Sequence, residues 1–292
     1  MTRAEACVLI YRAFRYEIDT VAANLYDFRS MVIDNDGTVY YIDGNTIYNT
    51  ENDKKLSIKS SFGESLENPY LAYDPYHDIV YLLAGGRLSI YDISNFDSPV
   101  LVLDKNNCPA LTKPTVDGKL AYCSSVTPQI AVTEDGALLI PFESNGTWLV
   151  SPQTKAVTQT SRLYSFSYAD EYAKVVNNVV IKFDESDNTA IVTALGESQG
   201  YEIVLDGGTP WNNANSVISR NGLIYFYDDD HGLCAYALDG SEYIMIDQAY
   251  IRVKDYNSLS NTNIWCLDVS ENDRAAFYDN SLKCIRLIRH AQ

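Results

Sequence analysis

The sequence contains few of the residues from which metal and redox sites are usually built. It has three histidines, and no two of its six cysteines are spaced as a C-x-x-C pair. Zinc sites and thioredoxin-like sites are therefore not expected, and the isolated cysteines are interpreted as core residues. The sequence also contains no phosphate-binding loop, dinucleotide fingerprint, HExxH motif or nucleophile elbow. No motif names a reaction.

Long hydrophobic segments are missing as well. No stretch approaches the ~18 uninterrupted apolar residues that a membrane helix requires, so no membrane span is expected. No signal peptide precedes the first structural segment of the sequence. We therefore expect either a cytosolic protein or a chain whose natural start lies upstream of Met1.

Positive charge is scarce relative to negative charge. Lys and Arg together number 22, Asp and Glu number 39, and the formal net charge is −17. A chain with this balance repels nucleic acid and anionic lipid, so neither is expected as a partner. The excess of carboxylates can serve solubility alone, or it can attract Ca²⁺ or a cationic partner.

The abundant residues favour β-structure. Apolar residues make up 46% of the chain, and 23 residues are Tyr, which strands favour. Residues 215–247 contain four short apolar segments, separated by turns at Asn221-Gly222, at residues 228–232 and at Asp239-Gly240. Asn-Gly and Asp-Gly turns favour hairpins because both positions tolerate positive φ. This stretch predicts one antiparallel sheet of four strands.

Weaker copies of this unit recur along the chain. The second strands of five units begin 41, 58, 42 and 44 residues apart. These starts are Thr38, Ile79, Ala137, Val179 and Leu223. A period in the low forties with four strands per unit is typical of a β-propeller, and strands that are apolar on both faces fit sheets packed between neighbouring sheets. We predict an all-β fold, a six-bladed propeller of four-stranded antiparallel sheets, with seven blades as the alternative.

Two parts of the repeat pattern stay open. The longest spacing contains an additional segment, residues 105–128, with its own Asp117-Gly118 turn. The last unit can be placed in two ways. It takes its last three strands from residues 263–267, 274–278 and 282–288, or it places residues 264–269 innermost and takes its outermost strand from residues 21–28. Closing the ring removes its largest exposed seam.

The first residues predict a short amphipathic helix. Thr2 can cap this helix while Glu5 reaches back to the Thr2 N–H, which is a capping box. The segment also resembles the end of an S-layer homology (SLH) domain, whose repeats finish with a Thr-Arg-Ala-Glu signature and an apolar helix. The matching residues are Thr2, Arg3, Ala4 and Glu5, followed by Ala6, Leu9, Tyr11, Arg12 and Ala13.

The resemblance to the SLH family implies a cellular location. In this family, tandem repeats hold exported bacterial proteins to cell-wall polysaccharide, and the signature Arg and Glu lie at or near the glycan-binding pocket. Arg3 and Glu5 match these two positions. The resemblance therefore implies a protein on the extracellular surface of a bacterium. Together with the repeats, it divides the chain into an N-terminal helical segment, residues 1–18, and a propeller domain, residues 19–292.

In a propeller, strand order decides on which face each loop lies. Turns between first and second strands lie on one face, and turns between second and third strands lie on the other, together with the links between sheets. The second face is predicted to hold the ligand-binding residues Glu143, Glu185, Trp211, Asp228, Asp229, Asp230 and His231. Aromatic planes beside carboxylates suit sugars, because the ring stacks while the acids accept hydroxyl hydrogen bonds. Calcium is an alternative ligand, although no EF-hand loop is present.

The three histidines are not expected to act together. His77 lies in a first-to-second turn, His231 in a second-to-third turn and His290 in the C-terminal tail. A two-histidine metal site is therefore not expected. His231 with Asp229 or Asp230 could form a single histidine–carboxylate site, and a solvated polar turn is the simpler interpretation.

Three functions fit these patterns. The first is a non-catalytic, exported cell-surface propeller, monomeric and without a cofactor, that presents a recognition face to a glycan or protein. The second is a carbohydrate-active enzyme, a glycoside hydrolase or lyase, with carboxylates on the same rim. The third is a structural spacer without a ligand.

Overall fold

A computed structural model describes most of the β-structure of the chain. The described residues are 16–62, 69–84, 88–115, 130–142, 146–159, 173–176, 179–184, 189–194, 200–204, 216–218, 224–228, 232–236, 242–247, 264–270, 272 and 274–290. Within these ranges the strands form six sheets, each with four strands, and all pairings between neighbouring strands are antiparallel. Residues 1–15 of the predicted N-terminal helical segment lie outside the described residues, and residues 16–18, which were predicted to belong to it, begin a strand.

The first three sheets follow the chain in simple up-and-down order. Sheet 1 contains β2 (Phe28–Ile33), β3 (Val39–Asp43), β4 (Thr46–Asn49) and β5 (Lys55–Ser57). Sheet 2 contains β6 (Tyr70–Asp74), β7 (Ile79–Ala84), β8 (Ser89–Asp92) and β9 (Val100–Leu103). Sheet 3 contains β10 (Ala131–Val132), β11 (Leu138–Phe142), β12 (Gly146–Val150) and β13 (Val157–Gln159).

The next two sheets repeat the same order, and the sixth does not. Sheet 4 contains β14 (Ala173–Val176), β15 (Val179–Asp184), β16 (Thr189–Ala194) and β17 (Gly200–Val204). Sheet 5 contains β18 (Ser216–Ile218), β19 (Ile224–Asp228), β20 (Gly232–Tyr236) and β21 (Glu242–Asp247). Sheet 6 contains β22 (Ile264–Val269), β23 (Ala275–Asp279), β24 (Cys284–His290) and, at its outer edge, β1 (Tyr16–Ala23).

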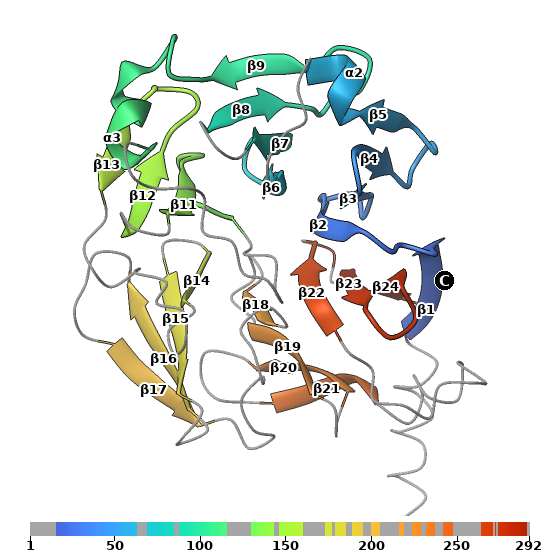
Figure 1. The fold of residues 1–292 in the computed structure, drawn as a ribbon. Coiled ribbons are helices and arrows are strands. Elements are labelled where there is room, and N and C mark those ends of the chain that lie inside the picture. The colour runs from blue at the N-terminus through green and yellow to red at the C-terminus, as the bar shows by residue number, and fades with distance from the viewer. Residues whose placement is uncertain are drawn as a thin grey trace, which may run out of the picture.

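The six sheets are arranged in a ring (Figure 1). The first strand of each sheet contacts the first strands of the two neighbouring sheets, and the contacts run in a closed cycle through β2, β6, β10, β14, β18 and β22. Side chains reinforce two of these seams. Ser30 Oγ accepts a hydrogen bond from the Leu71 N–H at 3.0 Å, and Asp268 Oδ2 accepts one from the Ile33 N–H at 2.9 Å. The predicted all-β architecture of four-stranded antiparallel sheets is confirmed.

The two ends of the chain meet in sheet 6, where Tyr16 pairs with His290 and Ala23 with Cys284. The second of the two arrangements expected for the last unit is therefore present, but its outermost strand begins at Tyr16 and not at residue 21. This strand also begins ahead of residue 19, where the sequence places the start of the propeller domain. Burial explains the earlier start, because Ile18 is only 6% exposed.

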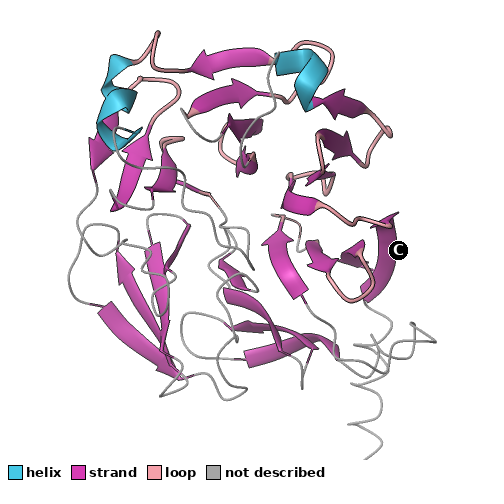
Figure 2. Cartoon of the chain, viewed as in Figure 1, coloured by secondary structure: helices cyan, strands magenta, loops and turns pink. Residues whose placement is uncertain are grey.

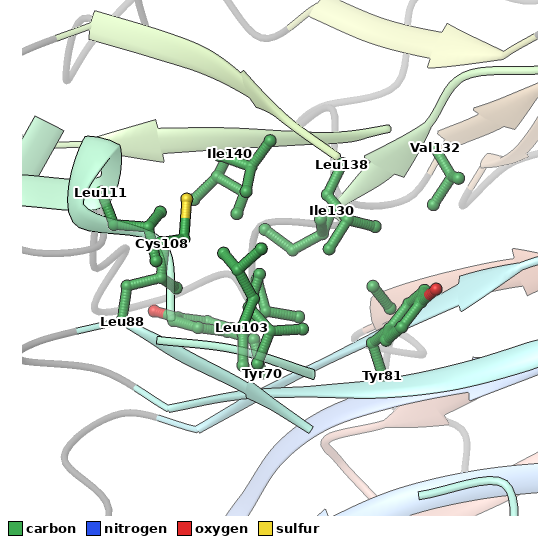
Figure 3. Packing of buried hydrophobic residues seen from close by; sticks show 14 residues of the cluster. Tyr70, Tyr81, Leu88, Leu103, Cys108, Leu111, Ile130, Val132, Leu138 and Ile140 are labelled. Atoms are coloured by element: carbon green, nitrogen blue, oxygen red, sulfur yellow. The ribbon is translucent and has the colours of Figure 1, made fainter. Parts of the chain in front are cut away.

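Hydrophobic clusters fill the spaces between adjacent sheets. The cluster between sheets 2 and 3 includes Tyr70, Leu88, Leu138 and Ile140 (Figure 3). A similar cluster lies between sheets 1 and 2, and a third lies between sheets 6 and 1. Burial on both faces explains the continuous apolar pattern of β7, in which every residue after Ile79 is buried.

Short helices in two loops were not predicted (Figure 2). The expected fourth strand of the first unit ends at Ser57, and α2 (Ile58–Phe62) follows. The additional segment between sheets 2 and 3 contains the 3-10 helix η1 (Pro109–Leu111) and α3 (Thr112–Thr115), whereas its Asp117-Gly118 turn lies outside the described residues. Leu111 is fully buried in the cluster between these sheets, so this segment fills space that the strands leave open.

Three of the cysteines are core residues. Cys108, Cys266 and Cys284 are buried, and none of the three forms a disulfide bond. In the described part of the chain, no helix has the length and apolar character needed to span a membrane.

Candidate functional site

The antiparallel order of the strands gives the ring two faces. Face A carries the first-to-second turns, such as residues 34–38 and 133–137, and the third-to-fourth turns, such as residues 151–156. Face B carries the second-to-third turns and the links between sheets, such as residues 24–27. The predicted sorting of turns by face therefore holds for the described strands.

Face B has a recurring aspartate. The second strand ends at an aspartate in four of the six sheets. These residues are Asp43 of β3, Asp184 of β15, Asp228 of β19 and Asp279 of β23. We call these four residues the aspartate rim.

Hydrogen bonds explain why aspartate suits this position. Asp279 Oδ1 accepts hydrogen bonds from the N–H groups of Ser281 and Leu282, at 3.0 and 3.1 Å, and so holds the turn after β23. Asp43 Oδ1 accepts one from the Asp27 N–H at 2.9 Å, and so joins the turn to the neighbouring link. Short polar side chains that bind nearby N–H groups are favoured in such turns. The carboxylates of Asp43 and Asp279 therefore hold the turns and links of face B, and Asp279 is buried while Asp43 is partly exposed.

Tyrosines lie near the rim in sheets 1 and 6. The rings of Tyr41 and Tyr48 stack with their centroids 4.8 Å apart, and those of Phe28 and Tyr278 stack at 3.9 Å. Burial raises the pKa of both Tyr41 and Tyr278 to about 12, and the negative charge of Asp43 contributes to each shift. These two phenols are therefore neutral hydrogen-bonding groups at physiological pH.

Among the predicted ligand-binding residues, Asp228 lies within the described strands. It is the last residue of β19 and pairs with Gly232 at the second-to-third turn. The remaining predicted residues lie outside the described residues: Arg3, Glu5, Glu143, Glu185, Trp211, Asp229, Asp230 and His231. The segments that contain Glu143, Glu185 and residues 229–231 connect second to third strands.

Face A contains a histidine–carboxylate pair that the sequence did not predict. Asp74 is fully buried at the end of β6, and its Oδ1 accepts hydrogen bonds from the N–H groups of Tyr76 and His77 at 3.0 and 3.2 Å. Its Oδ2 lies 2.8 Å from His77 Nδ1. The His77 side chain is 44% exposed. The carboxylate therefore fixes the imidazole through one ring nitrogen at the protein surface.

The pair sits against the next sheet. Gly136 has a φ of +74°, and a Cβ atom at this position would lie 2.8 Å from Asp74 Oδ2 and 3.0 Å from His77 Cε1. Gln153 Nε2 donates a hydrogen bond to Tyr81 Oη at 3.4 Å. The sequence correctly placed His77 in a first-to-second turn. The Asp-x-x-His spacing within one short turn was the signal that could have identified its partner.

A second polar cluster on face A joins sheets 1 and 2. The Tyr73 hydroxyl accepts a hydrogen bond from the Asn35 N–H at 3.0 Å and donates one to Asp78 Oδ1 at 2.8 Å. Asp34 Oδ1 accepts a hydrogen bond from the Thr38 N–H at 2.8 Å. Burial raises the pKa of Asp34, and the nearby Asp36 charge adds to the rise while the Thr38 hydrogen bond opposes it.

The described side chains do not form a metal site. Among the residues that the structure describes, no group of three or more His, Cys, Asp or Glu side chains is placed to hold a metal ion. The carboxylates of Asp34, Asp74 and Asp279 instead bind backbone N–H groups. The described side chains can bind polar or cationic groups at the surface of either face.

Comparisons with known proteins show the fold. No family model matches the chain, and no match is found among curated proteins. A gluconolactonase from Xanthomonas campestris is similar over 95% of this chain and 91% of its own, with a TM-score of 0.56 and 10% identity. A streptogramin B lyase is similar over 95% and 99%, with a TM-score of 0.51 and 11% identity. An auxiliary nutrient binding protein from Bacteroides thetaiotaomicron is similar over 95% and 77%, with a TM-score of 0.53 and 9% identity.

These similar structures are propellers, and the chain shares their fold. They comprise enzymes and a binding protein. At such low identity the likeness carries no activity from one chain to another.

Proposed function

We propose that the chain is a six-bladed β-propeller that acts as a non-catalytic recognition module. In this proposal, face B binds a glycan or a protein, and its contacts come from Trp211, Glu143, Glu185 and residues 228–231. The closed cycle of contacts among the six inner strands supports the number of blades. The aspartate rim supports the choice of face, because its residues end the second strands on the side where the predicted residues are also attached.

The aspartate rim is the observation that carries this proposal. The structure describes the side chains of two members, Asp43 and Asp279, and both accept hydrogen bonds from backbone N–H groups. Asp279 is only 2% exposed, so Asp43 is the one of these two that a ligand can reach.

We further propose that the protein acts outside the cell, on a bacterial surface. The Thr2-Arg3-Ala4-Glu5 segment supports this location through its resemblance to SLH repeats, in which Arg3 and Glu5 would contact cell-wall polysaccharide. Its fold is shared with a nutrient-binding protein, which is consistent with a role in capturing material at the surface.

A glycan array with the full chain tests the recognition face. We expect binding to a subset of glycans that falls at least tenfold in Trp211→Ala and in Asp229→Ala, since a stacked ring or a charged hydrogen bond contributes about 1.5 kcal/mol or more. Asp36→Asn is the matched control, because it removes one exposed charge from face A. Binding that survives both face B substitutions would overturn the proposal.

An enzyme that acts on carbohydrate is the second candidate, because two of the three similar structures described above are enzymes. It would use two carboxylates of the same rim as acid and base or nucleophile. Release of new reducing ends from a bound glycan, lost in Asp229→Asn with binding retained, would favour this candidate. Bound glycan recovered intact after long incubation would favour recognition.

A further inference from the structure

A cavity on face A of sheet 3 lies away from the aspartate rim. Its volume is about 410 Å³, within the range of small-molecule sites. The walls come from the first-to-second turn and from the strands and turn around residues 149–158. Its polar lining residues are Thr133, Glu134, Asp135, Ser151, Thr154 and Thr158.

The lining has a distinct chemical character. Four hydroxyl groups and two carboxylates surround a small aliphatic surface that includes Leu149, and none of the described lining residues is Lys, Arg or His. Glu134 and Asp135 are exposed, so their charges lie at the opening. A cavity with carboxylates at its mouth and no cation in its walls favours a positively charged ligand.

Two polar side chains lie deep in the wall. Thr133 is 3% exposed, and its hydroxyl is occupied: it accepts from the Ala137 N–H at 3.1 Å and interacts with the Asp135 carboxylate. Ser151 is 7% exposed, and its Oγ accepts from the Thr154 N–H at 3.2 Å. Ser151 also lines the cavity, so its hydroxyl can donate a hydrogen bond to a ligand or to water.

We propose that this cavity binds a hydroxylated amine of the size of one amino sugar. The ammonium group would lie against Glu134 and Asp135, and a ligand hydroxyl would accept from Ser151 and donate to the threonine oxygens. A sugar hydroxyl can do both, since it is a donor and an acceptor. This site is on the opposite face from the recognition rim, so each proposal can fail without the other.

Calorimetric titration of the full chain tests the charge requirement. The probes are glucosamine, N-acetylglucosamine and glucose, in mildly acidic buffer of low ionic strength that keeps the amine protonated. We expect glucosamine to bind at least about tenfold more tightly than the two neutral sugars, and its affinity to fall with added salt, because the distinguishing contact is an ion pair. Equal affinity for all three sugars, or no measurable binding, would overturn the proposal.

Substitutions locate the binding. Glu134→Gln removes one charge from an exposed side chain, and we expect glucosamine affinity to fall about threefold to tenfold with an unchanged melting temperature. Ser151→Ala should weaken all three sugars by a similar factor, because it removes a hydrogen bond to a hydroxyl and not to the amine. Asp36→Asn is the control, since Asp36 precedes Gly37 as Asp135 precedes Gly136. Glucosamine binding that is reduced equally by Asp36→Asn and Glu134→Gln would show only attraction to the overall charge and would contradict the site.

Discussion

The turns at residues 34–38 and 133–137 occupy equivalent positions in sheets 1 and 3. In both, the N–H of the first residue donates to the carbonyl of the fifth, at 3.0 Å in sheet 1 and 2.9 Å in sheet 3. In both, a side-chain oxygen of the first residue accepts from the fifth N–H. Asp34 provides a carboxylate in sheet 1, and Thr133 provides a hydroxyl in sheet 3. The same turn can therefore be held with or without a charge.

The two turns differ in what surrounds them. Gly37 lies against the side chain of Arg274, where an added Cβ would meet Cδ at 2.5 Å. Gly136 lies against the fully buried Asp74 of the neighbouring sheet. An arginine side chain can move into solvent, but Asp74 is held by the backbone of its own turn. Gly37 and Gly136 therefore lie in equivalent turns, but the neighbour of Gly37 can move away from an added Cβ atom more easily than the neighbour of Gly136.

Gly136→Ala should cause the largest loss of stability. The left-handed backbone costs about 1 kcal/mol with alanine, and the contact with Asp74 should add about 2 kcal/mol or more. Gly37→Ala has the same backbone cost, but Arg274 can shift. Gly44→Ala is the control, because a Cβ atom there meets only Asp27 Oδ2 at 3.6 Å. Urea unfolding would measure the loss of stability in all three variants. Equal losses in Gly136→Ala and Gly44→Ala would show that the contact with Asp74 adds no cost.

Asp74→Ala should destabilise by about 2–3 kcal/mol, because it leaves two backbone N–H groups and His77 without their acceptor at a buried position. His77→Ala should cost about 1 kcal/mol or less, since the imidazole is partly exposed and Asp74 keeps its backbone hydrogen bonds. Thermal unfolding of both variants checks the order. A larger loss in His77→Ala than in Asp74→Ala would show that the imidazole stabilises the fold more than the backbone hydrogen bonds of Asp74 do, and it would contradict this prediction.

Asp34→Thr gives sheet 1 the turn chemistry of sheet 3 and should act through pH. Because burial raises the pKa of Asp34 in the folded state, this residue contributes stability below its unfolded pKa, and that contribution is lost as pH rises through the folded pKa. The variant has no carboxylate at this position, so it does not lose this stability as the pH rises. As the pH rises from about 4 to 7, the variant should therefore become more stable relative to the natural chain. Urea unfolding at both pH values measures this, and a constant difference would contradict a raised pKa.

The repeat could be predicted from the sequence because turns are local. Asn-Gly and Asp-Gly pairs, with apolar segments between them, fix where strands begin and end without knowledge of distant contacts. The strands of residues 215–247 and the second strand that begins at Ile79 were placed in this way, and the structure agrees. The aspartates of the second-to-third turns were also visible, because they belong to the same local pattern.

Contacts between distant segments could not be predicted. Nothing near Tyr16 in the sequence indicates that it pairs with His290, and the apolar pattern alone started this strand too late. The Asp74–His77 pair lies within one turn, so a comparison of the three histidines with one another does not reveal it. The cavity of sheet 3 depends on how two separate turns approach each other, which residue spacing does not encode.

The pairing of β1 with β24 ties the first described strand to the last. During synthesis, residues 16–23 emerge from the ribosome long before their partner, residues 284–290. Until then, residues 16–23 lack their native pairing partner, and sheet 6 cannot close the ring between sheets 5 and 1. Removing residues 284–290 should therefore do more than shorten one sheet. It would leave β1 without a pairing partner and prevent sheet 6 from closing the ring.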